Sequence, residues 1–141
     1  MDAIVVGTDG SPGAEAAVHK VIELLPGAGV TVHLVCAIPS RSALERIGLT
    51  ARQEPTDLRG VAADVLARDE RRFEDAGFTV QKHAREGDAA QVIIDVAGEQ
   101  DAELIVVGAR GHTGLRRFVL GSVSGKLAHH ASTSLLIVQE D

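Results

Sequence analysis

The sequence of 141 residues has no tryptophan, no tyrosine and three phenylalanines. Stacking of bases on aromatic rings, which many proteins use to hold single-stranded nucleic acid, is therefore not available in quantity. Basic residues are also outnumbered, because 14 lysines and arginines stand against 20 acidic residues and give a net charge of -6. A broad nucleic-acid surface requires an excess of positive charge, so we expect no nucleic-acid partner.

Cysteine and long apolar runs are scarce as well. The one cysteine, Cys36, cannot form an internal disulfide, and no cationic, apolar leader precedes the first predicted strand. Both observations favour a reducing cytoplasm. No basic residue neighbours Cys36, so we interpret it as a small buried hydrophobe and not as a reactive thiol. No apolar run approaches the ~20 residues of a membrane span, and we expect no membrane association.

Apolar residues make up 45% of the chain, which is enough for a substantial core, and the length fits a single domain over residues 1–141. Short β-branched runs alternate with amphipathic segments, and every connection is long enough for a crossover. The pattern predicts an α/β fold with an open, five-stranded parallel sheet and helices on both faces. Strands are expected at 3–7, 30–38, 78–84, 104–107 and 134–138, and helices at 11–25, at 57–76, and from Asp88 and Ser122 onwards.

Two polar segments are interpreted as surface. The run 68–72, RDERR, mixes charges of both signs within the predicted helix 57–76, which usually marks a solvated face and not a binding patch. His129 and His130 are adjacent, and neighbours in a helix point about 100° apart, so they cannot chelate one metal ion as an i, i+4 pair could. We predict no metal site built from protein side chains.

A glycine-rich stretch, GARGHTGLRRFVLGS, occupies residues 108–122 between a predicted strand and a predicted helix. This arrangement binds phosphate, because unpaired backbone N–H groups and the positive end of the helix dipole converge there. Gly108 and Gly111 are expected to let the loop turn and approach a ligand closely, and Gly121 to leave room at the helix start. The stretch is the main candidate for a ligand site.

The spacing of these glycines excludes two common nucleotide motifs. A Walker A motif fails at residues 121–127, which are one residue short and end in leucine, and no G-x-G-x-x-G fingerprint occurs. The observed spacing is G-x2-G-x9-G-[ST], formed by Gly108, Gly111, Gly121 and Ser122. It resembles the ATP-binding signature of the universal stress protein family. The resemblance continues through IVVGTDGS, EGDAAQVIIDVA, LIVVGARG and a terminal LLIV.

The resemblance implies a sheet order of 3-2-1-4-5, which spacing alone cannot give. Strands one and four then lie side by side at the switch point where such sheets bind ligands. The implied ligand is ATP, with Mg²⁺ or Mn²⁺ bridging its phosphate oxygens. We expect the triphosphate at residues 121–123, where backbone donors cluster at the helix start.

Asp9 lies just past the carboxyl end of the first strand, where a carboxylate can accept hydrogen bonds from ribose or adenine. The alternative is a local turn or capping role.

In similar proteins the backbone at the end of the second strand holds the adenine, and this position corresponds to Ala37 here. At least one of Arg110, Arg116 and Arg117 is expected to face the phosphates, and Arg110 is preferred. The expected nucleotide-binding residues are Gly7, Thr8, Asp9, Ala37, Gly108, Arg110, Gly111, Gly121, Ser122 and Val123.

The resemblance further implies a stress-response regulator in which bound ATP changes the surface offered to an unidentified protein partner. The alternative is an enzyme on the same architecture, either a slow ATPase or an adenylyl-transferring relative. Catalysis would need a positioned base and clustered carboxylates, and beyond Asp9 no acid pair lies near the loop. We therefore prefer binding over turnover.

The last predicted strand, 134–138, is an edge strand in the implied order. Residues 135–138 are all apolar, and no lysine or proline interrupts them to discourage pairing at the edge. A symmetric dimer that joins this strand to its copy in antiparallel fashion satisfies the unpaired backbone groups. We expect a homodimer.

Overall fold

The computed structural model describes residues 1–40, 42, 45, 57–110 and 121–140. Within them, five parallel strands form one sheet in the order β3-β2-β1-β4-β5, which confirms the predicted fold class and strand order. The strands are β1 Ala3–Gly7, β2 Thr31–Ile38, β3 Thr79–Glu86, β4 Leu104–Gly108 and β5 Ser134–Val138. The helices are α1 Pro12–Leu24, α3 Leu58–Asp75, α4 Ala89–Glu99 and α5 Ser122–His130.

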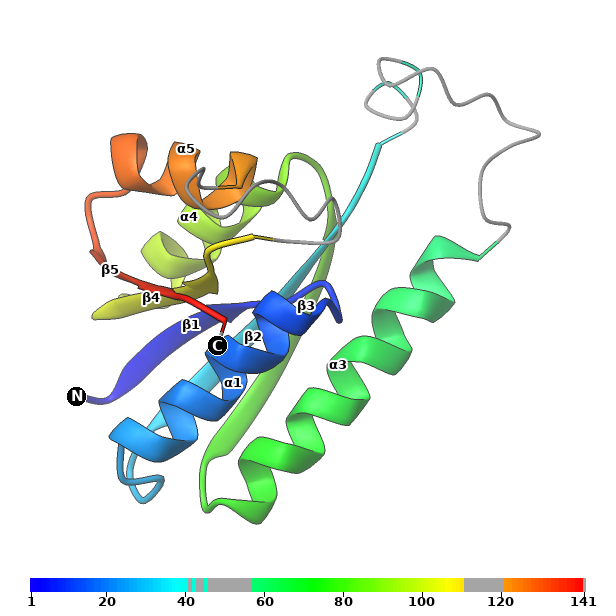
Figure 1. Ribbon diagram of the computed structural model, residues 1–141. Helices are drawn as coiled ribbons and strands as arrows, with labels where there is room; N and C mark the ends of the chain where they lie inside the picture. Colours follow the sequence, from blue (N-terminus) through cyan, green and yellow to red (C-terminus); the bar gives the residue numbers. More distant parts are fainter. Residues whose placement is uncertain (41, 43–44, 46–56, 111–120, 141) are drawn as a thin grey trace.

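The helices cover the sheet on both faces (Figure 1). α1 and α3 pack on one face, and α4 and α5 pack on the other. Neighbouring residues of β1 face opposite sides of the sheet. Ile4 and Val6 belong to the core under α1 and α3, whereas Val5 belongs to the core under α4 and α5. Burial on both faces explains why the central strands are continuous apolar runs in the sequence.

The pairing of the central strands determines at which edge of the sheet a candidate ligand site lies. β1 pairs with β2 on one side and with β4 on the other, with Ile4 opposite Val32 and Leu104. The strands are parallel, so their carboxyl ends meet at one edge of the sheet. β1 is the switch point, because the chain crosses from it to β2 on one side and later reaches β4 on the other.

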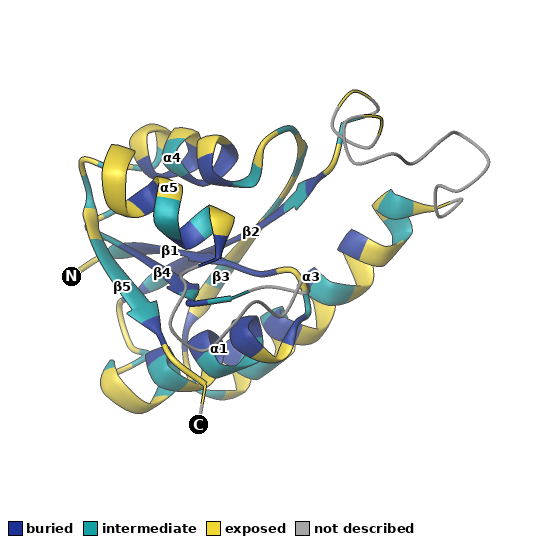
Figure 2. Cartoon of the chain, turned by 45° about the horizontal axis from the view of Figure 1, so that its top comes forward, coloured by how far each residue is buried: buried dark blue, intermediate teal, exposed yellow. Residues whose placement is uncertain are grey.

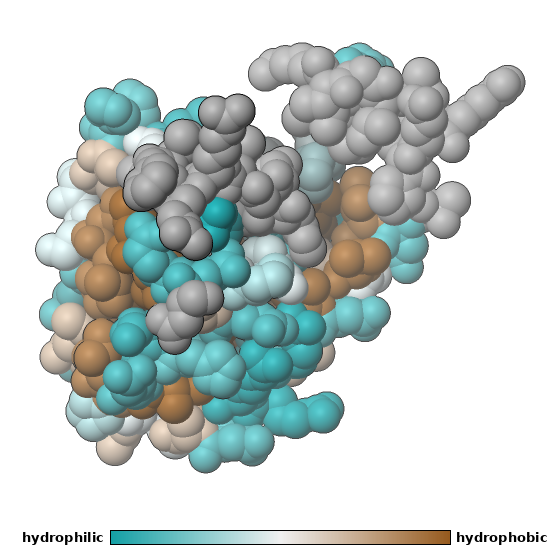
Figure 3. Space-filling view, in the orientation of Figure 1, coloured by the Kyte–Doolittle hydropathy of each residue, from teal (hydrophilic) through white to brown (hydrophobic). Residues whose placement is uncertain are grey.

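The two sheet edges differ in exposure. β3 is mostly exposed, as its polar sequence predicts, whereas Leu135, Leu136 and Ile137 of β5 are half-buried. Figure 2 shows the buried residues concentrated in the central strands, and Figure 3 shows apolar side chains gathered along the side of the molecule where β5 lies. None of the described helices is long and apolar enough to cross a membrane.

The charged run 68–72 of α3 is not entirely solvated. Asp69 is 1% exposed, which corrects the interpretation of this run as a solvated face. Five consecutive helical residues at about 100° each sample the whole circumference of the helix, so one of them must face inward wherever the helix is packed. In α3 that residue is an aspartate.

Candidate functional site

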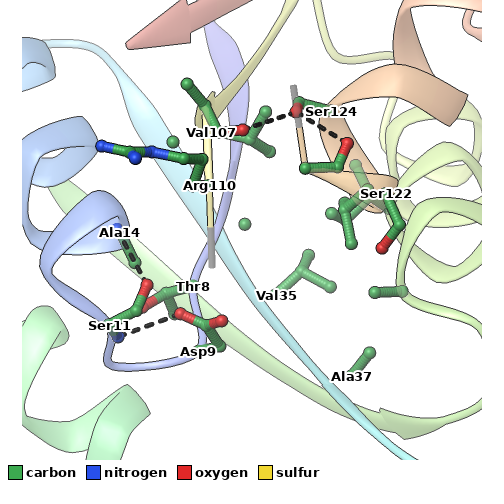
Figure 4. Close-up of a pocket in the computed structure, with 17 residues that line it drawn as sticks. Thr8, Asp9, Ser11, Ala14, Val35, Ala37, Val107, Arg110, Ser122 and Ser124 are labelled. Atoms are coloured by element: carbon green, nitrogen blue, oxygen red, sulfur yellow. Dashed lines mark hydrogen bonds between the residues drawn. The ribbon is translucent and has the colours of Figure 1, made fainter. Parts of the chain in front are cut away.

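A cavity of about 270 Å³ opens at the carboxyl ends of β1, β2 and β4, between the N-terminal ends of α1, α4 and α5. Figure 4 shows side chains from these elements converging on it. Its lining includes nine of the ten expected nucleotide-binding residues, namely Gly7, Thr8, Asp9, Ala37, Gly108, Arg110, Gly121, Ser122 and Val123. The tenth, Gly111, lies outside the described residues, as do Arg116 and Arg117. Tertiary structure thus gathers residues from distant parts of the chain, while their roles in binding stay predictions.

The N-terminus of α5 lies in the wall of this cavity. The N–H of Gly121 donates to the carbonyl of Ala109 at 2.7 Å, and the Ser124 hydroxyl donates to the carbonyls of Ala109 at 2.9 Å and Gly121 at 3.1 Å. These bonds tie the start of α5 to the end of β4. Ser122 and Val123, the first two residues of the helix, line the cavity.

The four described helices differ in how they begin. α5 starts after Gly121, which as a glycine supplies no side-chain cap to the first turn. The other three are capped by side-chain oxygens, supplied by Ser11 for α1, Asp57 for α3 and Asp88 for α4. The first N–H groups of an uncapped helix are unpaired donors at the positive end of its dipole. Of the three described helix starts at the cavity, that of α5 is thus the one best suited to receive an anion.

The loop that follows β1 forms the opposite wall. The N–H of Thr8 donates to the carbonyl of Val35 at 2.9 Å, and the Asp9 Oδ1 atom accepts from the N–H of Ser11 at 2.9 Å. Asp9 therefore has the turn role that was the alternative interpretation, and its contact with a ligand stays a prediction. Its carboxylate is exposed and also lines the cavity (Figure 4), so a turn role and a ligand contact are compatible.

An apolar surface completes the cavity, and sequence reasoning missed most of it. It comprises Val35, Ala37, Ala89, Ile93 and Val107, from two strands and from the first turns of α4. The helical periodicity of α4 indicates only that its inward face is apolar, not that the face projects beyond the end of β1. No aromatic ring is among the described lining residues, so these aliphatic side chains offer the apolar surface that a base requires.

Arg110 lines the cavity but is engaged elsewhere. Its Nη2 atom lies 3.9 Å from Glu140 Oε1, and Figure 4 shows its side chain running toward α1 and away from Ser122. The prediction that Arg110 faces bound phosphates stays a prediction, and it requires the guanidinium to turn from this position.

Gly108 has a packing role that the sequence did not predict. A Cβ atom at this position would lie 2.5 Å from the carbonyl carbon and oxygen of Gly13 in α1. The absence of a side chain therefore makes room for a neighbouring helix, while the expected close approach of this glycine to a ligand stays a prediction. Gly7 is similarly confined, because its Cβ would lie 2.7 Å from the Cδ1 atom of Ile93.

The expectation that Cys36 is a buried hydrophobe agrees with the structure. Cys36 is 6% exposed, and burial raises the pKa of its thiol to about 11, with smaller contributions from the charges of Asp9 and Asp69. Such a thiol is a weak nucleophile at neutral pH. In the described part of the chain, no three histidine, cysteine or acidic side chains gather closely enough to hold a metal ion.

Comparisons with known proteins agree with this architecture. The model of the universal stress protein family matches residues 1–139. Universal stress protein MJ0531 of Methanocaldococcus jannaschii is 29% identical over 145 residues, covering 97% of this chain and 81% of that protein. A universal stress protein of Mycolicibacterium smegmatis is 27% identical, but this chain spans only 45% of its length.

Solved structures show the same fold. Hypothetical protein MJ0577 superposes with a TM-score of 0.85 at 24% identity, covering 99% of this chain and 96% of that one. A universal stress protein in complex with cAMP has a TM-score of 0.74 at 24% identity, covering 99% and 98% of the two chains. The universal stress protein from Archaeoglobus fulgidus in complex with dAMP has a TM-score of 0.71 at 22% identity, covering 98% and 97%. Sequence motif, strand order and family model agree, and this chain belongs to the universal stress protein family.

Proposed function

We propose that this protein binds ATP in the cavity between β1 and β4 and acts as a nucleotide-dependent regulator in the stress response. The observation that carries the proposal is the uncapped start of α5 in the cavity wall, beside the switch point of the sheet. Backbone donors in this position bind phosphate groups. Two proteins of the same fold are solved with the adenine nucleotides cAMP and dAMP, which supports an adenine nucleotide as the ligand.

The lining suggests how ATP is oriented. The triphosphate lies at residues 121–123, where the α5 dipole and its first N–H groups favour negative charge. The adenosine lies against the apolar surface, with the backbone of Ala37 near the base and the Asp9 carboxylate accepting from ribose or base. Polar and apolar parts of the cavity thus correspond to polar and apolar parts of the nucleotide.

Mg²⁺ or Mn²⁺ would arrive with the nucleotide. Asp9 is the only acidic side chain among the described residues that line the cavity, so phosphate oxygens and water would supply most of the metal ligands. The same scarcity of carboxylates favours binding over hydrolysis, because phosphoryl transfer needs positioned groups for both the metal and the nucleophile. In the regulatory role, the bound nucleotide changes the surface around the cavity and so its affinity for a partner protein.

The proposal is tested by titrating the purified protein calorimetrically with ATP, with and without Mg²⁺. We expect saturable binding, and we expect Gly121→Val to abolish it by filling the space at the start of α5. Gly125→Ala is the matched control, because it lies one turn further along α5 and an added Cβ would have no atom within 4 Å. A folded Gly121→Val protein with wild-type affinity would refute the placement. Formation of ADP during incubation would favour the slow ATPase.

A further inference from the structure

A buried aspartate on α3 is bonded directly to the proposed nucleotide site. The hydroxyl of Thr8, at the carboxyl end of β1, donates to the Oδ2 atom of Asp69 at 2.7 Å. Thr8 is 7% exposed and Asp69 is 1% exposed, and they are 61 residues apart in the sequence. The short distance is typical of a charge-assisted bond between a hydroxyl and a carboxylate. Asp69 itself does not line the cavity, whereas Thr8 does.

α3 contacts the same loop at a second point. A Cβ atom on Gly10 would lie 2.9 Å from the Cγ2 atom of Val65, which precedes Asp69 by one helical turn. The Thr8 hydroxyl also accepts from the N–H of Gly10 at 3.3 Å. Thr8 is therefore held between the helix and its own loop, and one face of α3 supports residues 8–10 from behind.

Stability is a poor explanation for a carboxylate in this place. The second oxygen of Asp69, Oδ1, makes no hydrogen bond among the described residues, and the Nε atom of Arg68 lies 3.8 Å from it. Burying a charge with one oxygen left without a hydrogen bond is costly, and a buried charge is by itself weak evidence of a stabilising role. Asp69 therefore calls for a role other than stabilising the fold.

We infer that Asp69 is a positioning residue for the nucleotide site. The inference rests on the proposed function. By holding the Thr8 hydroxyl, Asp69 sets the conformation of residues 8–11 before the nucleotide arrives, and with it the direction of the Asp9 carboxylate. A loop that is already in its binding conformation loses less conformational entropy when the ligand binds. Asp69 thus raises affinity for the adenosine moiety without touching the ligand.

The test compares ATP affinity and thermal stability in a set of variants. Asp69→Leu removes the acceptor, Thr8→Val removes the donor, and Asp69→Asn keeps an acceptor oxygen without the charge. Glu70→Leu is the matched control, because Glu70 is the next residue of α3 but pairs with Lys82 of β3, 3.1 Å away, and does not line the cavity. Each variant is titrated calorimetrically with ATP, and its melting temperature is measured.

We expect Asp69→Leu to keep or raise the melting temperature while weakening ATP binding by about tenfold, within the range of coupling for directly bonded residues. Thr8→Val should weaken binding to a similar extent, and the double variant should bind no more weakly than either single variant. Asp69→Asn and Glu70→Leu should bind as the wild type does. Parallel losses of stability and affinity, or additive effects of Thr8→Val and Asp69→Leu, would overturn the positioning role. If Asp69→Leu does not fold, wild-type affinity in Thr8→Val would overturn it by itself.

The same titrations separate the two hypotheses. A wild type that binds ATP, together with a folded Asp69→Leu protein of equal affinity, overturns the role of Asp69 and leaves the proposed function standing. A wild type that binds no adenine nucleotide overturns both.

Discussion

Gly108 at the end of β4 and Gly13 in the first turn of α1 lie in direct backbone contact. A Cβ atom on Gly108 would lie 2.5 Å from the carbonyl carbon of Gly13 and 3.0 Å from its Cα atom. This contact brings the start of α1 onto the end of β4, and so joins the two loops that flank the cavity. The distance between the cavity walls therefore depends on two residues without side chains.

We predict that Gly108→Ala destabilises the protein by about 1–3 kcal/mol, the usual cost of overpacking, because backbone atoms cannot move aside as a flexible side chain could. Urea denaturation measures the effect. Gly98→Ala is the control, since Gly98 is exposed in α4 and an added Cβ would have no atom within 4 Å. It should stabilise the protein by up to about 1 kcal/mol through helix propensity. An unchanged urea midpoint for Gly108→Ala would contradict this account of the contact.

The second prediction concerns selectivity for the nucleoside. Without aromatic stacking, recognition of adenosine depends on backbone groups and on Asp9. We expect Asp9→Ala to weaken ATP binding by about tenfold, as loss of a hydrogen bond to a charged group does, and to leave binding of inorganic triphosphate unchanged. Competition titrations with both ligands measure the difference. Asp9→Asn retains an acceptor for the Ser11 N–H and controls for the turn. Equal losses for the two ligands would show that Asp9 is structural.

The third prediction concerns two histidines beneath α4. His33 Nδ1 and His83 Nε2 lie 3.0 Å apart, so one ring donates to the other. Burial lowers the pKa of His33. The pKa of His83 is lowered first by burial and then by the nearby His33 and Arg85, against an opposing effect of Glu99. Both histidines are therefore neutral in the folded protein at a pH where the unfolded chain begins to bind protons.

The contribution of these two histidines to the free energy of unfolding should consequently be constant above the pKa of about 6.5 that histidine has in the unfolded chain. It should fall as the pH decreases below that value. Urea denaturation between pH 7.5 and 5 covers about one unit or more on either side of that value. The free energy of unfolding should fall less for His33→Gln than for the wild type over this interval. His19→Gln, on the exposed surface of α1, is the control and should retain the wild-type slope. Identical slopes for His33→Gln and the wild type would exclude this pair as the source.

The fourth prediction concerns oligomeric state. β5 is an edge strand, and its residues 135–137 are apolar and half-buried in the single chain. We expect antiparallel pairing of β5 with its copy to bury them further, so light scattering should report about twice the 14.7 kDa chain mass. Ile137→Lys should shift this mass toward the monomer. Gln81→Lys, on the opposite edge strand β3, should not. A monomeric wild type at high concentration would contradict the dimer.

Local patterns in the sequence were sufficient to predict most elements. Ser11 and Pro12 predict the start of α1, and the structure confirms both the cap and the first helical residue. The glycine spacing from Gly108 to Ser122 singled out the loop whose described ends line the cavity. These signals are local because caps, turns and apolar periodicity depend on a few neighbouring residues. The strand order came from the family resemblance, since hydrogen bonds between distant strands leave no mark on spacing.

The tertiary structure alone decided how these elements act on one another. No local pattern distinguishes Asp69 from the other charged residues of the run 68–72, because its burial depends on which side of α3 meets the β1 loop. The close contact of Gly108 with Gly13 and the contribution of Ile93 to the cavity wall arise in the same way. The sequence by itself therefore determined the fold class and the position of the candidate ligand loop. Packing of helices against strand ends decided which side chains are buried, paired or exposed around it, because those contacts join residues far apart in the chain.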